Sequence, residues 1–517
     1  MEQILGQLER ALWGGPLAAL ILGTGLYLHL RLRFLPLREL PRALRLLLRR
    51  EKSGGGVSPF AALCTSLSAT IGTGNIVGVA AALALGGAGA LLWMLLSALT
   101  GLAVKYAEGF FAVRYRFRAP DGTRSGGPFA YILLGLGRSW RPLAVSFALF
   151  GAAAGVCGAG TFVQIHSVTA SARWFLERHF APGTLVTLGS VSLPLPVVLL
   201  GLLLTALSAL VIAGGIRRVS SLSAVLVPVM GGLYVLCCLW VLVRSREALG
   251  GALHRIVSEA FSPRAAGGGL LAAAQAGISR GVFSNEAGLG TAPIALAASD
   301  GDDPVEQGLI SMTGTFFDTV LICTLTGLTI LCAGVDIRSA GIAAVMEAFC
   351  AGLPLPAAVS QGLVLTCLLL FSFTTVVGRN YYAVQCLDFL THGRRGARRV
   401  YQCLYVLTVL VAPWLSLQTV WHAAAICNGL MAIPNLVGLL LLSPRLEAAG
   451  NRGRGIVNTF IAAVQSHPVG DAFEAQADAS LSPLLGGLPF LGGRCPGKPG
   501  KTAPTAQSSG FPAAGGD

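Results

Sequence analysis

The stretch GVFSNEAGLGTAPIA, residues 281–295, places a carboxylate, Glu286, among glycines and apolar residues inside a long apolar segment. Glycine destabilises a helix interior, because it loses more backbone freedom on folding than other residues do. We therefore expect the helix to break here and to expose unpaired backbone N–H and C=O groups. Irregular backbone within a membrane survives only against protein or a water-filled cavity. The stretch thus predicts a broken helix beside a polar binding site.

The composition of the 517 residues places this segment in a membrane protein. Charged residues make up 12% of the chain and hydrophobic residues 54%, and the mean hydropathy is +0.71. Soluble domains carry about twice that fraction of charge. The net charge of +14 is explained by basic loops next to anionic headgroups, so we expect membrane lipid and no nucleic acid as a partner.

Eleven apolar segments have about the 20 residues that a helix needs to cross the hydrocarbon layer. The predicted spans are 14–30, 57–86, 88–112, 142–171, 193–213, 221–243, 267–298, 308–334, 355–384, 400–419 and 421–443. Each segment is continuously apolar rather than alternating, which excludes a β-barrel. The predicted fold class is an all-α integral membrane protein.

Basic residues gather in alternate loops and predict the orientation of the chain. The inner loops would hold Arg31–Lys52, Arg114–Arg124, Arg217–Arg218, the RRGARR run of 394–399 and Arg445–Arg454, and the outer loops roughly a third as many basic residues. We expect the N-terminus outside and the C-terminus in the cytoplasm. The N-terminal MEQILGQLERALWGG has no basic n-region, so we expect no removable signal peptide. Residues 446–517, rich in Gly, Pro, Ala and Ser, are predicted to form a disordered cytoplasmic tail after a transmembrane domain of residues 1–445.

A second segment, CTSLSATIGTGNIVGVAAALALGG at 64–87, has the same character as the first. We predict that both are discontinuous helices, spans two and seven. Each opens a block of five spans, 57–243 and 267–444, and the two blocks run in opposite directions, with 14–30 as a peripheral helix. Such a five-plus-five inverted repeat puts substrate and ions at mid-bilayer, where half-helix N-termini face anionic groups and freed carbonyls coordinate cations.

Several long motifs carry a specific resemblance. They are PFAALCTSLSATIGTGNIVGVA (59–80), KYAEGFFAVRYR (105–116), GGPFAYI (126–132), GVFSNEAGLGTAPIA, GTFFDTVLICTLTGL (314–328) and NGLMAIPNLVGLLLLS (428–443). In this order they resemble the alanine/glycine:cation symporter family, also called sodium:alanine symporters, over about residues 10–445. The resemblance implies a LeuT-type fold and uptake of a small neutral amino acid, coupled to Na⁺ or H⁺, across the inner (plasma) membrane of a bacterium. We expect no cofactor.

The substrate-binding residues are predicted at the two breaks and near them. Thr73, Gly74 and Asn75 would present amides and polar side chains to a carboxylate, although small residues also pack helices closely. Glu286 would receive the substrate ammonium group, the alternative being a buried structural carboxylate. Phe283 would form an apolar wall or belong to the core. Gln164 matches a polar position that resembles a substrate contact, and an interhelical hydrogen bond is the alternative.

A cation site is predicted from adjacent hydroxyls in FSFTTVVGRNYYAVQ (371–385). The resemblance implies sodium ligands from Thr374 and Thr375 together with the carbonyls of Ala69 and Ile71, and Thr375 also lies beside the substrate. Hard oxygen ligands suit an alkali cation, but helical Thr often bonds its own i−4 carbonyl. Asp318, an acid inside a span, is a further candidate for the ion site or for a gate.

Arg379 departs from the family pattern, which has Trp at this position. The guanidinium either faces the cavity as a substrate contact, which favours a more polar substrate such as glutamine or serine, or extends to the cytoplasmic surface. Lys105 and Glu108 stand at i and i+3 and are predicted to form a salt bridge. Two other classes of function stay open: a channel or sensor on the same scaffold, and an intramembrane enzyme. The enzyme is disfavoured because it needs a nucleophile or metal constellation, and the sequence has no H-E-x-x-H motif and no second acid near Glu286.

Overall fold

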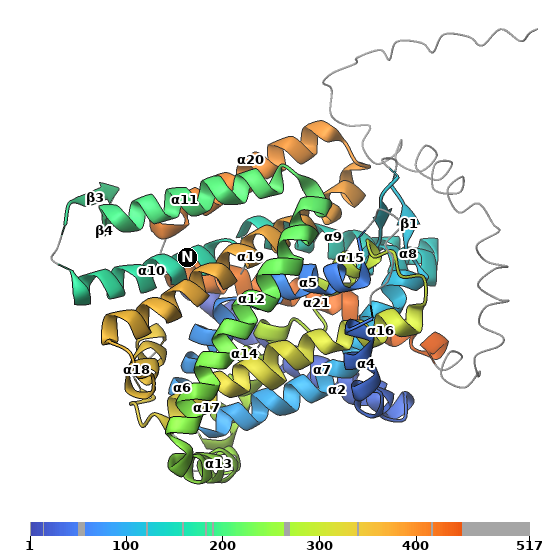
Figure 1. Ribbon diagram of the computed structural model, residues 1–517. Helices are drawn as coiled ribbons and strands as arrows, with labels where there is room; N and C mark the ends of the chain where they lie inside the picture. The colour runs from blue at the N-terminus through green and yellow to red at the C-terminus, as the bar shows by residue number, and fades with distance from the viewer. Residues whose placement is uncertain are drawn as a thin grey trace, which may run out of the picture. The chain divides into compact units, whose positions relative to one another are not determined.

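The computed structural model describes residues 2–446 except 14, 50–56, 120–121, 158–159, 181–182, 189–190, 263–268, 339–340 and 415–416. From residue 447 on, the predicted tail lies outside the described residues. The described chain is helical, with two short antiparallel hairpins that the sequence did not predict (Figure 1).

The first part of the chain, up to residue 260, contains short helices, long helices and both hairpins. They are α1 (Glu2–Trp13), α2 (Pro16–Arg31), α3 (Leu35–Arg38), α4 (Leu40–Leu47), α5 (Pro59–Thr70), the π-helix η1 (Gly74–Gly78), α6 (Val79–Gly86), α7 (Gly89–Arg114), β1 (Phe117–Arg118), β2 (Arg124–Ser125), α8 (Pro128–Leu136), the 3₁₀ turn η2 (Arg138–Trp140), α9 (Arg141–Cys157), α10 (Phe162–His179), β3 (Leu185–Leu188), β4 (Val191–Pro194), α11 (Leu195–Ile212), α12 (Gly215–Arg244) and α13 (Arg246–Ala260).

The second part of the chain begins with the segment quoted first. Its elements are α14 (Gly269–Asn285), α15 (Ala292–Ala297), α16 (Pro304–Thr315), the π-helix η4 (Phe316–Cys323), α17 (Thr324–Cys332), α18 (Ile342–Gly352), α19 (Ala357–Thr391), α20 (Arg395–Val411), the 3₁₀ turn η5 (Ala412–Trp414) and α21 (Leu417–Leu442). In hairpin β1–β2, Phe117 pairs with Ser125, and in β3–β4, Leu185 pairs with Pro194.

Eight helices of the described residues are long and apolar enough to cross a membrane. A ninth span forms if α5 and the η1–α6 helix, bent by 55° at their break, are counted together. The predicted spans 267–298 and 400–419 coincide with shorter helices, α14 with α15 and α20. The structure therefore agrees with a helical, multi-pass membrane protein, and the count of eleven stays a prediction.

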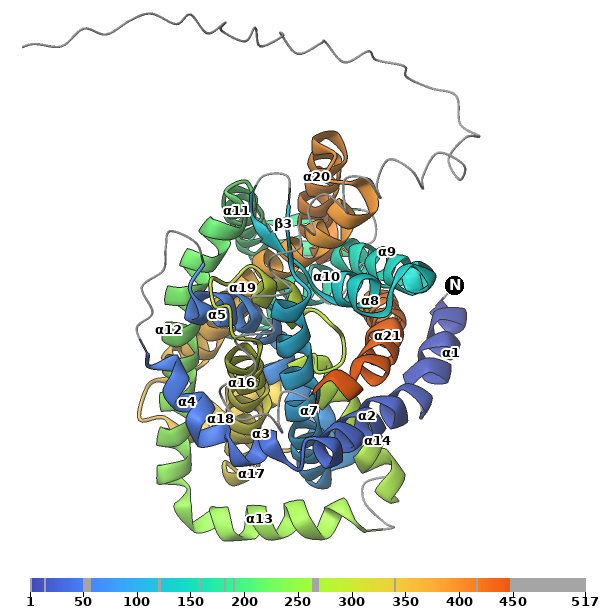
Figure 2. The same cartoon turned by 90° about the vertical axis from the view of Figure 1, so that its right-hand side faces the viewer.

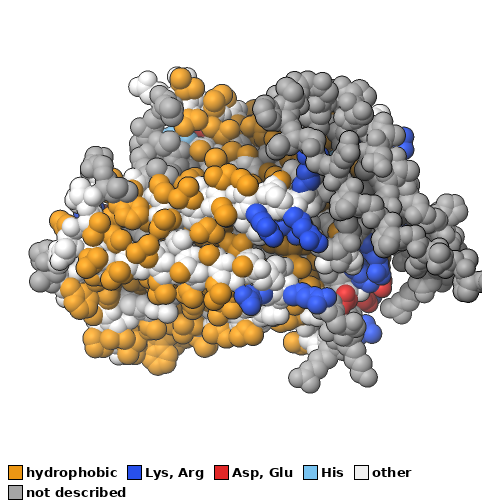
Figure 3. All heavy atoms as spheres, turned by 90° about the horizontal axis from the view of Figure 1, so that it is seen from above, with side chains coloured by type: hydrophobic (Ala, Val, Ile, Leu, Met, Phe, Trp, Pro, Cys, Tyr) orange, Lys and Arg blue, Asp and Glu red, His pale blue; other side chains and the backbone are white. Residues whose placement is uncertain are grey.

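The outer surface is apolar where a lipid-facing surface is expected. On α11, Leu199, Leu203 and Leu210 are 55%, 55% and 62% exposed. Figure 3 shows hydrophobic side chains across this view of the molecule, with Lys and Arg gathered toward one side. Apolar surface of this extent indicates a membrane-embedded face.

The core is built around α7. Helices α14, α15 and α16 all pack against α7, while α19 packs against α5, α9 and α12. Helix α13 lies across the end of the bundle, against α7 and α17 (Figure 2). Ser58 caps α5 by accepting a hydrogen bond from the amide of Ala61 at 3.2 Å, a geometry typical of a helix start. Both broken helices thus lie against long, continuous neighbours.

Candidate functional site

The first break lies between α5 and η1. Helix α5 ends at Thr70, Ile71 has extended backbone (φ −71°, ψ 100°), and the π-helix begins at Gly74. The amide of Gly72 donates to Asn75 Oδ1 at 2.9 Å. Asn75 is fully buried, so its side chain satisfies a backbone group that the break has freed.

The second break, residues 286–291, joins α14 to α15. Glu286, Gly288 and Gly290 have φ of 55°, 88° and 78°. Such values suit glycine and are uncommon for a residue with a side chain. The amide of Ala287 donates to Asn285 Oδ1 at 2.9 Å. The glycines therefore allow the chain to leave the helix at the place predicted from the sequence.

Glu108, on the neighbouring helix α7, hydrogen-bonds the backbone of the second break. Its Oε1 accepts hydrogen bonds from the amides of Gly288 at 3.2 Å and Gly290 at 3.1 Å, and from Asn435 Nδ2 at 2.8 Å. The predicted salt bridge is present, with Lys105 Nζ 4.0 Å from Glu108 Oε2. The sequence predicted Glu108 only as a member of that salt bridge, and its part in the site was not predicted. The signal was an acid in the interior of a 26-residue apolar helix.

Asp318 connects the two breaks. Its Oδ1 accepts from Asn75 Nδ2 at 2.8 Å, and its Oδ2 accepts from Ser284 Oγ at 2.8 Å and Thr319 Oγ1 at 2.7 Å. Asp318 lies in the π-helix η4, Asn75 follows the first break, and Ser284 precedes the second. π-Helical turns inside α-helices occur frequently at functional sites. Ser284 Oγ and Thr319 Oγ1 could also turn their lone pairs toward a cation.

Glu286 and Arg379 form a buried ion pair. Arg379 Nη2 contacts Glu286 Oε1, and Thr291 Oγ1 donates to Glu286 Oε2 at 2.5 Å. Glu286 is fully buried and Arg379 is 5% exposed. The alternative in which Arg379 extends to the cytoplasmic surface is therefore wrong. A substrate ammonium group at Glu286 would share this carboxylate with the guanidinium.

The structure brings Gln164 and Thr375 to the first break. Gln164 Oε1 accepts from the amide of Thr73 at 3.0 Å. Thr375 Oγ1 lies 3.1 Å from the carbonyl oxygen of Ile71 and 2.8 Å from that of Phe371 on its own helix, and its single proton can go to either. Thr374 turns away: its hydroxyl contacts the carbonyls of Leu370 and Phe371 on its own helix, both at 3.0 Å, and Met230 Sδ. Of the two predicted threonines, only Thr375 contacts the break.

Gly74 contacts the second broken helix, whereas Phe283 packs against α21. A Cβ at Gly74 would lie 3.5 Å from the Cα of Ser284, so the two broken helices touch there. The ring of Phe283 packs on Trp421, with centroids 5.0 Å apart, and Trp421 also lies under the guanidinium of Arg280. Phe283 therefore has a packing partner of its own on α21.

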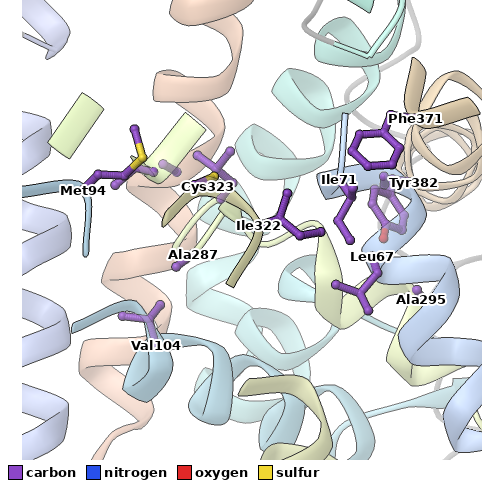
Figure 4. Close-up of a cluster of buried hydrophobic side chains, with 14 of the residues drawn as sticks. Leu67, Ile71, Met94, Val104, Ala287, Ala295, Ile322, Cys323, Phe371 and Tyr382 are labelled. Carbon is purple, nitrogen blue, oxygen red and sulfur yellow. The ribbon is translucent and has the colours of Figure 1, made fainter. Parts of the chain in front are cut away.

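Buried apolar side chains come from the same elements as the polar groups of the site. Figure 4 draws Leu67 and Ile71 from the first broken helix, Ala287 from the second break, Ile322 and Cys323 from η4, and Phe371 and Tyr382 from α19 in a single cluster. These residues are buried, and Phe371 has no exposed surface. The polar groups of both breaks thus lie in a low-dielectric surrounding, where unpaired charges are costly.

The ends of the two broken helices that we predict to be cytoplasmic are held together. The carbonyl of Ser299 accepts from Arg116 Nη1 at 2.8 Å and from Arg124 Nη1 at 3.0 Å, and both arginines pair with Asp302. The amide of Asp300 donates to the carbonyl of Val57 at 2.8 Å. Partial burial and the charge of Arg124 lower the pKa of Arg116 to about 10. Arg116 thus remains charged at neutral pH, and these ends of the two broken helices are joined by charged contacts.

Comparisons with known proteins agree with this geometry. The profile of the sodium:alanine symporter family matches residues 1–451. An uncharacterized transporter of Haemophilus influenzae is 44% identical, covering 85% of this chain and 93% of its own. The sodium/alanine symporter AgcS of Methanococcus maripaludis is 41% identical (83% and 92%), and the probable sodium/glutamine symporter GlnT of Bacillus subtilis is 34% identical (86% and 88%).

Among solved structures, the chain resembles that of MhsT in complex with L-phenylalanine. The TM-score is 0.50 at 14% identity, and the likeness covers 78% of this chain and 99% of that one. At this identity the likeness shows the fold alone, which is the LeuT-type transporter fold. The family match over most of the chain and the relatives above 30% identity then show that the chain belongs to the sodium:alanine symporter family, a family of transporters rather than enzymes.

Proposed function

We propose that this protein couples the entry of Na⁺ to the uptake of a small neutral amino acid of the alanine/glycine class by alternating access. The observation that carries the proposal is Asp318, a buried carboxylate that hydrogen-bonds residues of both breaks. An ion bound there would contact both broken helices, and could bias the equilibrium between two conformations of the transporter. The family and the sodium/alanine symporter among the relatives support the same coupling.

The finer architecture is part of this proposal. We place eleven spans in the membrane, with residues 57–243 and 267–444 as inverted repeats, the N-terminus outside and the C-terminus in the cytoplasm of a bacterium. The two breaks open at corresponding places in the two halves, after α5 and after α14. Broken helices in corresponding positions of two halves are typical of inverted-repeat transporters.

The substrate carboxylate would bind at the start of η1. Thr73, Gly74 and Asn75 lie at this N-terminus, where amides and the helix dipole favour an anion. Thr73 Oγ1 is buried and, within the described residues, has no hydrogen-bond partner. A buried hydroxyl of this kind is available to a ligand. Gln164 would orient the Thr73 amide, and Phe283 would bound the apolar side of the substrate.

The cation would bind at Asp318, with Ser284 Oγ and Thr319 Oγ1 turning from donors to ligands. The buried Asp, Glu, Lys and Arg side chains of the described residues, each at most 5% exposed, are Lys105, Glu108, Glu286, Asp318 and Arg379. With all five side chains ionised, the two positive charges and the three negative charges leave a net charge of −1. Asp318 is the acid outside the two salt bridges, although Lys105 also acts on it electrostatically. One monovalent cation would balance the site, and Na⁺ accepts such hard oxygen ligands.

A more polar substrate is the second candidate, and Arg379 favours it. The guanidinium lines a small hollow together with Thr291 and Tyr382. An arginine offers five donors, which suit an amide or hydroxyl better than a methyl group. The relative named a probable sodium/glutamine symporter is consistent with such a substrate in the family. Arg379→Trp should then shift the preference from glutamine or serine toward alanine and glycine.

Counterflow in proteoliposomes tests the proposal. Wild-type protein should exchange labelled alanine, with uptake stimulated by an inward Na⁺ gradient. Asp318→Asn should raise the half-saturating Na⁺ concentration about 100-fold or more, because a buried cation loses its charged partner. Asp388→Asn is the matched control, since Asp388 pairs with Arg398 at the α19–α20 junction, away from the breaks.

Three results would contradict the proposal. Exchange without any gradient-driven accumulation indicates a channel or sensor, and uptake driven by a pH gradient alone indicates a proton. Unchanged Na⁺ dependence in Asp318→Asn removes Asp318 from the cation site.

A further inference from the structure

We infer that Arg379 is a built-in cation that takes the place of a second coupling ion, so that the protein transports one Na⁺ per substrate. The inference rests on the proposed sodium coupling and specifies its stoichiometry. Arg379 contacts both broken helices: Nη2 pairs with Glu286 at the second break, and Nε donates to the carbonyl of Ala69 at 3.4 Å, near the end of α5.

The end of α5 is a place where a positive charge is expected. The last four carbonyls of a helix lack intrahelical partners and carry the negative end of the helix dipole. The sequence predicted sodium there, bound by Ala69, Ile71, Thr374 and Thr375. In the structure the Ala69 carbonyl accepts from Arg379, the Ile71 carbonyl lies 3.1 Å from the Thr375 hydroxyl, and Thr374 faces its own helix and Met230. The carbonyl oxygens predicted for sodium thus contact a guanidinium and a hydroxyl.

The surrounding backbone leaves room for this arginine. A Cβ at Gly160 would lie 2.5 Å from Arg379 Cβ and 3.1 Å from its Cδ. A Cβ at Gly378 would lie 3.0 Å from the Cβ of Ala69 and 3.1 Å from its amide nitrogen. Glycine at these two positions lets α19 approach α5 and lets the arginine stem pass beside the turn that precedes α10. The inward position of Arg379 is therefore fixed by packing.

The buried charges give the stoichiometry. With Arg379, the five buried charged side chains sum to −1, as counted above, and without it they would sum to −2. A zwitterionic substrate adds no net charge. Because unbalanced charge in a low-dielectric interior is costly, the present chain needs one external monovalent cation, and a chain with a neutral residue at 379 needs two.

The experiment measures accumulation of labelled alanine at equilibrium in proteoliposomes with the membrane potential clamped at zero. For a tenfold inward Na⁺ gradient, wild type should accumulate alanine about tenfold and Arg379→Gln about a hundredfold, since each coupled ion contributes one factor of ten. Arg379→Lys keeps the charge and should stay near tenfold. Arg398→Gln, which removes a guanidinium paired with Asp388, is the control and should match wild type.

Radioactive sodium binding to purified wild-type protein gives a second readout that does not depend on any variant. One Na⁺ per chain is expected, and two would overturn the inference. An Arg379→Gln variant that transports yet accumulates only tenfold would also overturn it. If wild-type uptake ignores the Na⁺ gradient and no Na⁺ binds, the proposed sodium coupling itself is wrong, which is a different outcome from two ions per chain.

Discussion

The first break covers residues 71–73, between α5 and η1, and the second covers residues 286–291, between α14 and α15. At the first, Asn75 accepts the amide of Gly72, three residues before it. At the second, the amides of Gly288 and Gly290 donate to Glu108, which lies on α7, 180 residues before Gly288 in the sequence. Both breaks have one local side-chain contact, from Asn75 at the first and from Asn285 at the second. They differ in their distant partners: Gln164 binds one amide of the first break, whereas the carboxylate of Glu108 binds two amides of the second.

This difference suggests different tasks for the two breaks. The second break has three residues at positive φ and is anchored to α7 by Glu108 and to α21 by Asn435, which also donates to the carbonyl of Gly288 at 2.9 Å. The first break contacts Asp318 and Gln164, the residues of the proposed ion and substrate sites. We expect substitutions of the residues that anchor the second break, Glu108 and Gly290, to affect mainly stability and those at the first break to affect mainly binding.

Glu108→Leu should have the largest effect on stability. The change leaves the amides of Gly288 and Gly290 without an acceptor and Lys105 without its partner, and breaking a buried pair costs about 3–5 kcal/mol. Thermal unfolding in detergent, followed by tryptophan fluorescence, measures the loss. Glu108→Gln keeps one acceptor and should fall between Leu and wild type. Glu259→Gln is the control, because Glu259 is only partly buried and accepts a single amide, that of Ala88, at 2.8 Å. Equal losses for Glu108→Leu and Glu259→Gln would refute the anchoring role of Glu108.

Gly290→Ala should be the next most severe. Gly290 has φ of 78°, and a Cβ there would lie 2.6 Å from Pro128 Cγ and 2.7 Å from Phe147 Cε2. Left-handed backbone costs alanine about 1–2 kcal/mol, and overpacking adds about 1–3 kcal/mol. The same unfolding measurement should therefore show a loss of at least about 2 kcal/mol. Gly396→Ala, at a position with open space around it, should change the unfolding temperature very little; a similar small change for Gly290→Ala would mean that the second break tolerates other backbone geometry.

The sequence predicted the places of both breaks because glycine clusters act locally. GTGN and NEAGLG weaken a helix whatever surrounds them, because glycine is a poor helix former. The Asn75 side chain also accepts the hydrogen bond of the nearby Gly72 amide. The partners of the second break were not predictable in this way. Glu108 and Asn435 reach Gly288 from sequence separations of 180 and 147 residues, and no spacing rule connects them. The two hairpins were missed because strands of two to four residues leave almost no periodic pattern.

In the candidate site, too, the polar residues could be predicted from the sequence, but their partners could not. Residue type indicated that Asp318, Glu286 and Gln164 are polar groups inside spans, and each is buried in the structure. The pairing of Glu286 with Arg379 depends on the approach of α19 to the second break. Thr374 and Thr375 are chemically equal in the sequence, and only the rotation of α19 decides that Thr375 faces the Ile71 carbonyl.

Asn75→Ala should destabilise the protein less than the changes at the second break and reduce Na⁺ affinity more. The change frees the Gly72 amide and removes one of three donors from Asp318, which costs about 1–3 kcal/mol. Unfolding with and without Na⁺ separates the two effects, because ligand binding to the folded state raises stability. We expect the stabilisation of wild type by Na⁺ to be largely lost in Asn75→Ala and kept in Gly290→Ala. A full Na⁺ effect in Asn75→Ala would mean that the first break does not take part in ion binding.

Gly74→Ala should have the smallest effect on stability of the four and tests the comparison most directly. Gly74 is helical at the start of η1, its φ is not positive, and its Cβ would meet Ser284 Cα at 3.5 Å, an ordinary contact. Alanine is also the better helix former by about 0.8–1 kcal/mol, so the protein should not be destabilised. If the substrate carboxylate binds at this N-terminus, the added methyl group lies between the breaks and should still weaken alanine uptake about tenfold or more. Stability retained with uptake reduced would separate binding at the first break from anchoring at the second. Unchanged uptake would move the substrate carboxylate away from Gly74, whereas a loss of stability as large as that of Gly290→Ala would remove the distinction between the two breaks.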